Sequence, residues 1–451
     1  MASAAEQLAS NLNFGAFAKA TELKKRILFA LGALIVYRLC TYVPLPGIDP
    51  TALKQVFENL QRGGGGVIDM FNVFSGGALE RMSIIALNIM PYISASIIMQ
   101  LLTSMSPTLG QLKKEGETGR KKINQYTRYG TVLLTVVQGY GIAVGLENLS
   151  TGAGATAVID PGWYFRATTV ITLMGGTMFL MWLGEQITAR GVGNGISLII
   201  FAGIVAELPK ALAGTLSLGS QGALPAFLVP GLLLLIAGVI IGIVFFERAQ
   251  RRLLIQYPKR QVGNKLFQGD SSHLPLKLNT AGVIPPIFAS SLLLMPLTIA
   301  NFSSTGGPEW LGTVTALLGQ GQPLYLALYV SGIVFFCFFY TAIVFNPEET
   351  ADNLKKHGGF VPGIRPGKRT AEYIDYVMTR LTVVGSIYLA IVCILPEILI
   401  SQYQIPFYLG GTSLLIVVNV TMDTVAQIHG HLMAHQYDGL IKKAKLRGSR
   451  R

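Results

Sequence analysis

Residues with the chemistry for catalysis or metal binding are few in this chain. His431 and His435 stand one helical turn apart and could share a metal ion, but a basic, solvated helix near the C-terminus explains them better. Gly191, Gly193 and Gly195 are spaced like a phosphate-binding loop, yet no strand precedes them, so a dinucleotide site is not expected. The sequence also has no P-loop and no paired carboxylates at membrane depth. We therefore expect no enzyme, no cofactor and no metal site.

Ionisable residues inside the apolar stretches are also scarce, Arg38 and Asp423 being the main ones. Such residues mark proton and ion pathways in membrane proteins, so their scarcity weighs against an ion-coupled secondary transporter or a lipid scramblase, the alternatives to a channel. The three cysteines Cys40, Cys337 and Cys393 are too far apart to suggest a disulfide framework or a metal site.

Isoleucines form a pattern that does recur. Two pairs are four residues apart, so each pair lies on one face of its helix. Two further isoleucines occupy positions equivalent to the second member of each pair in an internal repeat. A lone isoleucine in a membrane span usually packs or contacts lipid, but equivalent positions favour a collar of branched side chains, which gates by excluding water. We predict a pore ring of Ile89, Ile93, Ile196, Ile200, Ile287 and Ile416.

The elements that must position this ring are membrane spans. The chain has 451 residues, 51% hydrophobic and 13% charged, with a mean hydropathy of +0.50, whereas soluble domains average about 25% charged residues. A span takes about 20 apolar residues. Ten such stretches occur, at about 27–43, 82–103, 129–146, 167–184, 196–217, 226–246, 281–300, 324–345, 377–395 and 407–427. We expect an all-α polytopic membrane protein.

The basic residues alternate between the two sides of these spans. The loops at 103–128, 247–278 and 346–376 and the C-terminal tail are rich in Lys and Arg, whereas the intervening loops hold almost none. By the positive-inside rule, both termini face the cytoplasm. The first apolar stretch lacks a small-residue cleavage site, so we expect it to be retained as a helix.

Ten spans also suggest two inverted repeats of five, at 1–217 and 218–451. Two local matches support the repeat: PYISAS, starting at Pro91, matches PPIFAS, starting at Pro285, and GISLII, starting at Gly195, matches GTSLLI, starting at Gly411. Pro91 and Pro286 are expected inside their helices, where a proline removes a backbone hydrogen bond and would loosen them.

A short apolar segment precedes the second span. Residues 68–74 are too few to cross a bilayer, and glycines bound them on both sides, at 63–66 and at 76–77. A re-entrant piece of this kind is tolerated where other protein covers its backbone. We predict a hinged stopper, or plug, at about 66–76, which includes Ile68, Met70, Phe71, Asn72, Val73, Phe74, Ser75, Gly76 and Gly77.

Two of the basic loops, 247–278 and 346–376, are longer than topology requires and carry Pro and Gly. They are expected to be shaped, exposed loops that dock a cytoplasmic partner, including one that bears RNA phosphates. Lys259, Arg260 and Arg365 are the candidate contacts.

The sequence resembles the SecY family, the central subunits of the bacterial protein-conducting channel, over nearly the whole chain. The motifs that carry the resemblance include FNVFSGGALERMS, NIMPYISASIIMQLL, KKEGETGRKKINQYTRYGT, RGVGNGISLIIFAGIV and GFVPGIRPG.

This resemblance implies an hourglass pore between two five-helix halves in the bacterial cytoplasmic membrane. It implies a lateral gate of helices 2 and 3 against 7 and 8, with Ser94, Gln100 and Asn279 along it. It also implies a function, the passage of signal-bearing preproteins across the membrane and of nascent membrane segments into lipid. The implied partners are SecE, SecG, the SecA motor and the ribosome.

Overall fold

The structure is a computed structural model that describes residues 21–55, 72–148, 157–220, 228–258, 260–262, 265–267, 271–303, 317, 322–403 and 411–448. Within these residues, an apolar helix lies at the position of each of the ten expected spans. Seven of the helices are long and apolar enough to cross a membrane, and the shorter or less apolar α3, α6 and α12 complete the set. Their bounds are α3 Thr21–Cys40, α6 Met90–Met105, α8 Glu117–Asn148, α9 Trp163–Arg190, α10 Gly195–Ser220, α11 Leu228–Arg248, α12 Ile284–Ser303, α14 Pro323–Val344, α16 Lys368–Tyr403 and α17 Gly411–Gly448.

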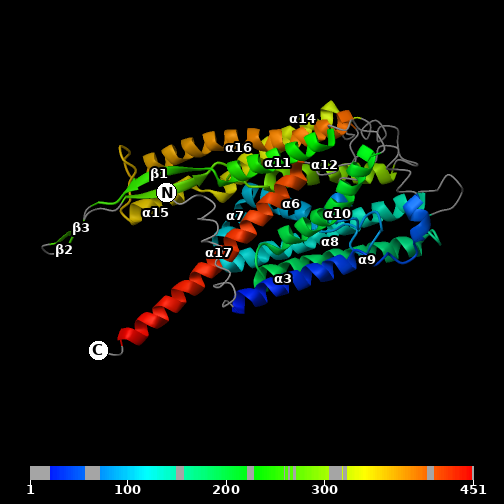
Figure 1. Ribbon diagram of the computed structural model, residues 1–451, viewed down its shortest axis with the longest axis horizontal. Coiled ribbons are helices and arrows are strands. Elements are labelled where there is room, and N and C mark those ends of the chain that lie inside the picture. Colours follow the sequence, from blue (N-terminus) through cyan, green and yellow to red (C-terminus); the bar gives the residue numbers. More distant parts are fainter. Residues whose placement is uncertain are drawn as a thin grey trace.

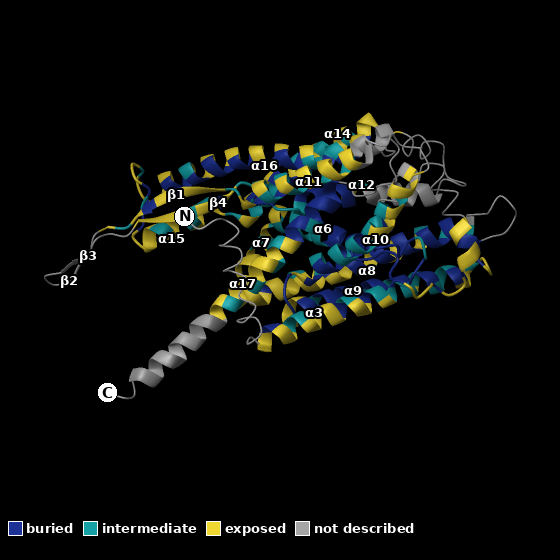
Figure 2. Ribbon diagram, viewed as in Figure 1, coloured by how far each residue is buried: buried dark blue, intermediate teal, exposed yellow. Residues whose placement is uncertain are grey.

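The helices run along the long axis of the molecule, with α3, α8 and α9 on one side and α11, α12, α14 and α16 on the other (Figure 1). Helix α12 packs against α6 and α8 across the middle, and α10 packs against α17. Buried residues concentrate where α6, α8, α10 and α12 meet (Figure 2). The two groups of helices therefore meet around α6 and α10.

The second expected span, 82–103, is only partly helical. Helix α6 begins at Met90, and residues 76–89 form turns instead. Pro91 consequently lies in the first helical turn, where its missing N–H has no intrahelical partner to lose. Pro285 and Pro286 likewise open α12, which begins at Ile284. The prediction that prolines loosen the interior of these helices was wrong, because both helices start just before them.

Most of the irregular segment before α6 is buried within the protein. Met82 and Ala86 are completely buried. The Ile84 N–H donates to the Val43 carbonyl at 2.9 Å, and the Leu45 N–H donates to the Met82 carbonyl at 2.9 Å. Non-helical backbone at membrane depth needs such partners because lipid offers none.

Helix α9 makes room for this segment with a glycine. A Cβ on Gly176 would lie 2.0 Å from the Ile84 carbonyl oxygen, closer than real Cβ atoms come. Only glycine allows α9 to approach the turn so closely, so this residue helps to set the position of the segment.

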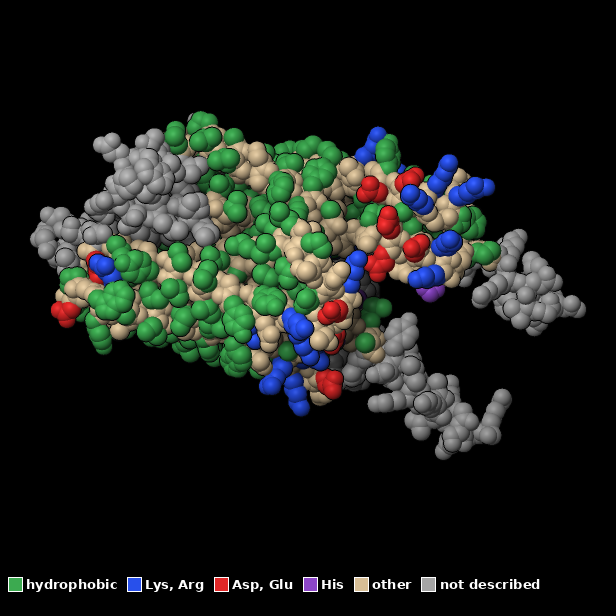
Figure 3. Space-filling view, turned by 180° about the vertical axis from the view of Figure 1, so that it is seen from behind, with side chains coloured by type: hydrophobic (Ala, Val, Ile, Leu, Met, Phe, Trp, Pro, Cys, Tyr) green, Lys and Arg blue, Asp and Glu red, His purple; other side chains and the backbone are tan. Residues whose placement is uncertain are grey.

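One end of the molecule carries an antiparallel hairpin of β1 Gln250–Gln256 and β4 Ser271–Lys277, in which Leu253 faces Leu274. A short hairpin of β2 Arg260–Val262 and β3 Lys265–Phe267 extends it. Helix α7, Pro107–Lys114, and helix α15, Pro347–Lys356, lie toward the same end, where charged side chains gather beyond a broad apolar band (Figure 3). The described parts of the loop at 247–278, predicted to be shaped and exposed, thus form two antiparallel strand pairs at this end of the molecule.

Candidate functional site

Five of the six isoleucines predicted to form a ring line a single cavity. Their side chains come from four separated parts of the chain: the end of the turn segment with α6, then α10, α12 and α17. Residues far apart in sequence thus converge at one point in the interior. The cavity is lined by Phe74, Asn88, Ile89, Met90, Ile93, Ile200, Ile287, Ser290 and Ile416.

This cavity is almost closed by its own lining. The space inside it that the centre of a water molecule can occupy is about 10 Å³. One water requires about 10–15 Å³ and two to four polar partners, and this lining is mostly aliphatic. Ile89 and Ile416 are each 1% exposed, and Ile93 and Ile200 are 7% exposed. The side chains therefore meet closely enough to exclude a column of water.

Ile196, the sixth predicted ring residue, is not in the lining of this cavity. It stands in the first turn of α10, where a Cβ added to Gly184 of α9 would lie 3.1 Å from its Cγ1 atom. Ile196 therefore lies close to α9, and it is one helical turn before Ile200 on α10.

Phe74 closes the cavity from the predicted plug. The Asn88 side-chain amide donates to the Phe74 carbonyl at 2.6 Å. Asn88 has a φ of +50°, a left-handed conformation that asparagine tolerates better than most residues. The plug residue is thus tied to the segment that leads into α6.

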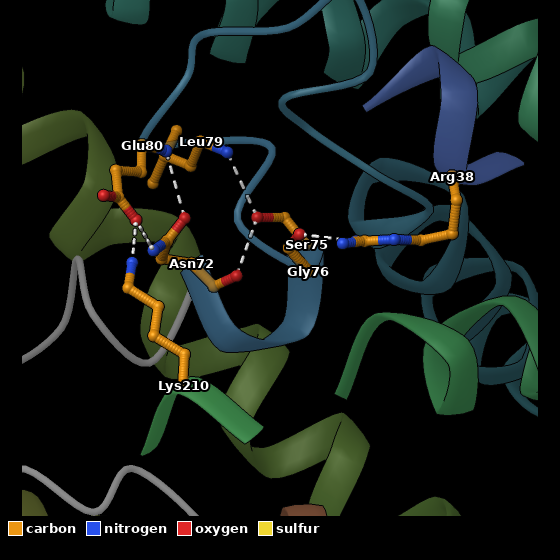
Figure 4. A network of polar contacts seen from close by, with 7 residues as sticks. All are labelled: Arg38, Asn72, Ser75, Gly76, Leu79, Glu80 and Lys210. Carbon is orange, nitrogen blue, oxygen red and sulfur yellow. Dashed lines mark hydrogen bonds and ion pairs between the residues drawn. The ribbon is translucent and has the colours of Figure 1, made fainter. Parts of the chain in front are cut away.

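Two side chains of α3 bind the backbone of Ser75 and Gly76, where the predicted plug ends. The Tyr37 hydroxyl donates to the Ser75 carbonyl at 3.2 Å, and the Arg38 guanidinium donates to the Gly76 carbonyl at 2.8 Å. Arg38 is the intramembrane charge noted in the sequence, and its partner is a backbone oxygen left free where the plug helix ends (Figure 4).

The plug turn also rests directly on α10. A Cβ on Gly203 would lie 2.9 Å from the Phe74 carbonyl oxygen and 3.0 Å from the Tyr37 hydroxyl. A Cβ on Gly76 would lie 2.9 Å from the Cα of Gly203. These paired glycines let the two backbones touch, so α10 supports the plug without an intervening side chain.

A polar network closes the base of the plug (Figure 4). The Asn72 side chain accepts from the Glu80 N–H at 3.0 Å and donates to Glu80 Oε2 at 3.2 Å. Lys210 of α10 donates to the same Oε2 atom at 2.9 Å. Glu80 Oε2 therefore accepts hydrogen bonds from two elements, the predicted plug and α10.

The three residues assigned to a lateral gate occupy different surroundings. Ser94 is buried within α6, at 8% exposure. Gln100 lines a cavity of about 300 Å³ together with residues of α6, α7, α8 and α14, and its Oε1 atom is buried without a described partner. Asn279 is buried just before α12 and donates to Glu247 Oε1 at 2.6 Å and to the Gly282 carbonyl at 3.1 Å. Both of its described hydrogen-bond partners belong to the second half of the chain.

A direct side-chain contact links the two halves beside this region. The Ser291 hydroxyl of α12 donates to the Met90 sulfur of α6 at 3.8 Å. Because α12 also packs against α8, helices from both sides of the predicted gate are in contact.

Some of the predicted residues can be described only in part or not at all. Arg365 is exposed in the turn before α16, and its carbonyl accepts from the Thr370 hydroxyl at 2.9 Å. Arg260 belongs to β2, but its side chain is not described. The residues that lie outside the described part of the chain are Ile68, Met70, Phe71 and Lys259.

Sequence reasoning assigned no role to several residues that hold the plug: Tyr37, Asn88, Gly203 and Lys210. Only Arg38 carried a usable signal, because a lone charge inside a span requires a partner. A glycine in an apolar helix and a lysine near a span end are common, so nothing local distinguished them.

Known proteins resemble this chain over most of its length. The SecY family matches residues 83–425. The Escherichia coli K12 protein named "Protein translocase subunit SecY" is 57% identical over 428 residues, which cover 95% of this chain and 96% of that protein.

Two solved structures share the fold at low identity. One is described by the statement that the plug domain of the SecY protein stabilises the closed state of the translocation channel and maintains a membrane seal; it has a TM-score of 0.59 and 18% identity, with 91% of this chain and 92% of that chain covered. The other is Sec61 in the canine ribosome-channel complex from the endoplasmic reticulum, with a TM-score of 0.57, 17% identity and the same coverage.

The contact between Gly203 and the plug turn gives a direct test of this packing. Gly203→Val is expected to displace residues 74–76, because the added side chain would overlap the Phe74 carbonyl, and overpacking of this kind costs about 1–3 kcal/mol. Ser75 is 1% exposed, so a Ser75→Cys probe should react with a maleimide at least about fivefold faster in the Gly203→Val background. The native cysteines are replaced by alanine for this measurement.

Gly214→Val is the matched control, since Gly214 lies on the same helix and a Cβ there would meet nothing within 4 Å. Equal labelling of Ser75→Cys in both backgrounds would show that α10 does not support the plug.

Proposed function

The chain belongs to the SecY family of protein translocase subunits, and we propose that a collar of isoleucines under a plug seals its pore. As a member of this family, it is a multi-pass, all-α channel subunit that conducts proteins, and not an enzyme. An ion-coupled transporter or a lipid scramblase is not favoured.

The observation that carries the proposal is the convergence of Ile89, Ile93, Ile200, Ile287 and Ile416 on one small cavity beneath Phe74. An aliphatic constriction of this kind resists ions because water inside it has no polar partners, yet it leaves no binding site that would hold a polypeptide. Flexible aliphatic side chains can close around an extended chain of any sequence. Ile196 belongs to the same collar in this proposal and closes around the chain one turn away.

The plug would comprise residues 66–76, with Phe74 as its contact to the collar. Val73 and Phe74 supply its apolar face, and Ser75, Gly76 and Gly77 supply the sharp exit that α3 and α10 hold. Displacement of this segment must precede passage of a polypeptide through the collar.

The gate would open between residues 1–217 and 218–451, along α6 and α8 on one side and α12 and α14 on the other. Ser94, Gln100 and Asn279 would be the polar positions along it. Leu, Ile, Phe and Val each favour the bilayer by about 0.3–0.6 kcal/mol, so an apolar signal of roughly a dozen such residues supplies several kcal/mol for separating these helices. The same opening would release membrane segments sideways into lipid.

The projecting hairpin with Lys259 and Arg260, and the turn with Arg365, would dock cytoplasmic partners. The fold is shared with Sec61 in a canine ribosome-channel complex, and basic side chains on exposed elements suit RNA phosphates or an acidic protein surface. The partners in this proposal are the ribosome, the SecA motor and the subunits SecE and SecG.

The alternation of basic loops supports an orientation with both termini in the cytoplasm. The similarity to a protein translocase subunit of Escherichia coli supports the bacterial cytoplasmic membrane as the location. The charged hairpin and α15 would then face the cytoplasm, and the plug would lie on the outer side of the collar.

The collar is tested by making it polar. Ile93→Asn combined with Ile287→Asn should hydrate the constriction and let ions leak through the resting channel, raising conductance in planar bilayers by about tenfold or more, since buried amides bring water with them.

The matched control places the same change outside the collar. Ile98 and Leu292 lie on the same two helices but are 43% and 55% exposed, so Ile98→Asn with Leu292→Asn should leave conductance unchanged. Resting conductance that is unchanged in the collar variant as well would refute the seal.

The gate is tested by locking α6 to α12. In a chain whose native cysteines are alanine, Met90→Cys with Ser291→Cys should form a disulfide on oxidation, because the two side chains already touch. Translocation of a preprotein should stop and should return on reduction.

Arg128→Cys with Glu185→Cys is the control pair, since these side chains form an ion pair at 2.6 Å between α8 and α9 within one half. That crosslink should leave translocation intact. Full export with α6 and α12 crosslinked would remove these helices from the gate.

Arg365→Glu tests the docking turn. Because Arg365 is exposed, the variant should fold normally but lose about tenfold or more in motor-driven translocation, through repulsion of an acidic surface. Lys24→Glu, an exposed change at the start of α3, serves as the control; equal translocation by the two variants would show that Arg365 does not contact the motor.

A further inference from the structure

The base of the plug is held by one carboxylate that two other elements share. Glu80 Oε2 accepts from Asn72, the first described residue of the predicted plug, and from Lys210, on α10 (Figure 4). Asn72 also accepts from the Glu80 backbone, so residues 72–80 form a closed loop. The lysine therefore binds the same carboxylate oxygen that closes this loop.

The ion pair lies where it can break and re-form. The Lys210 side chain is 61% exposed, whereas the Glu80 side chain is 21% exposed. The lysine reaches in from solvent to a carboxylate that the plug base half encloses. An exposed ion pair alone stabilises little, but here its loss also frees the charge to which Asn72 is bonded.

A second set of charges lies beside this pair. Glu207, one helical turn before Lys210 on α10, approaches Gly77 so closely that a Cβ there would lie 2.5 Å from its Oε1 atom. Arg81, next to Glu80, lies on the same side and stacks on the Tyr42 ring at 4.3 Å. The middle of α10 thus places one anion and one cation, Glu207 and Lys210, close to Gly77, Glu80 and Arg81.

The described polar partners of the plug base belong to α3, α10 and the segment 78–89, all in the first half of the chain. The plug base is therefore bound to the first half of the chain. Its contacts with α10 differ in kind from its contacts with α3. Tyr37 and Arg38 hold buried carbonyls, whereas Lys210 holds an accessible carboxylate. The Lys210–Glu80 contact is the tie that water can replace most easily.

We propose that Lys210 and Glu80 are positioning residues that latch the plug base to α10 and set how readily the plug leaves the pore. This latch rests on the proposed function of the plug. With the latch intact, only a strongly apolar signal opens the channel. With the latch broken, the closed state is less favoured and weaker signals suffice.

The test uses the full chain in complex with its partner subunits, reconstituted in planar bilayers. Lys210→Gln should raise the frequency of resting openings about two- to fivefold, as expected from the strength of an exposed ion pair. Lys210→Glu should raise it further through repulsion of Glu80. Lys210→Glu combined with Glu80→Lys should return it toward the wild-type frequency.

Translocation gives a second readout. A preprotein with a signal shortened by two leucines should be exported about two- to fivefold faster by Lys210→Gln than by the wild type. Lys54→Glu is the control, since Lys54 is an exposed lysine of the outer segment that precedes the plug, and it should change neither readout. If Lys210 had a merely structural role, its substitution would lower the thermal stability and leave the opening frequency unchanged. The charge swap would then have no change in opening to reverse.

Deletion of residues 68–75 separates the two levels of the argument. A resting channel that stays as tight after this deletion would overturn the plug itself. A deletion that leaks, together with Lys210 variants that open no more often than the wild type, would overturn the latch alone. Opening that the charge swap fails to reverse would also reject the latch.

Discussion

The structure depends on one constraint: backbone groups that leave a helix at membrane depth must find partners within the protein. Residues 72–89 contain a single helical turn followed by irregular backbone, and they lie in the centre of the bundle. Val43 and Leu45 supply partners from the chain just after α3, and the side chains of Tyr37, Arg38 and Asn88 bind the carbonyls where the plug turn ends. The irregular backbone of residues 76–89 is tolerated at this depth because these partners are present.

This requirement dictates the small residues around the segment. Gly176 of α9 and Gly203 of α10 lie against carbonyl oxygens of the irregular backbone, where any side chain would collide. Each helix therefore approaches to backbone contact at one point and spreads apart elsewhere. Phe74, Ala78 and Leu79 also belong to the buried apolar core, so this segment is held by apolar packing as well as by hydrogen bonds and charges.

The constriction follows the opposite principle. Its lining is apolar apart from Asn88 and Ser290. The Asn88 Nδ2 group donates to the Phe74 carbonyl, and its Oδ1 atom is buried without a described partner. The constriction excludes water because it has few polar groups that could bind water, whereas the plug base makes polar contacts. In the proposed function, different contacts would seal the pore and hold the plug, so each could change separately.

The sequence by itself determined the membrane spans, the isoleucines that meet in the interior and the family, because hydropathy, helical spacing and local motifs are properties of neighbouring residues. It could not determine that α6 starts at Met90 rather than near Met82, because the turns that replace its first part depend on covering helices elsewhere in the chain. Nor could it pair Lys210 with Glu80, which lies 130 residues away. Such contacts are decided only when distant helices pack, since nothing in the local sequence around either residue specifies its partner.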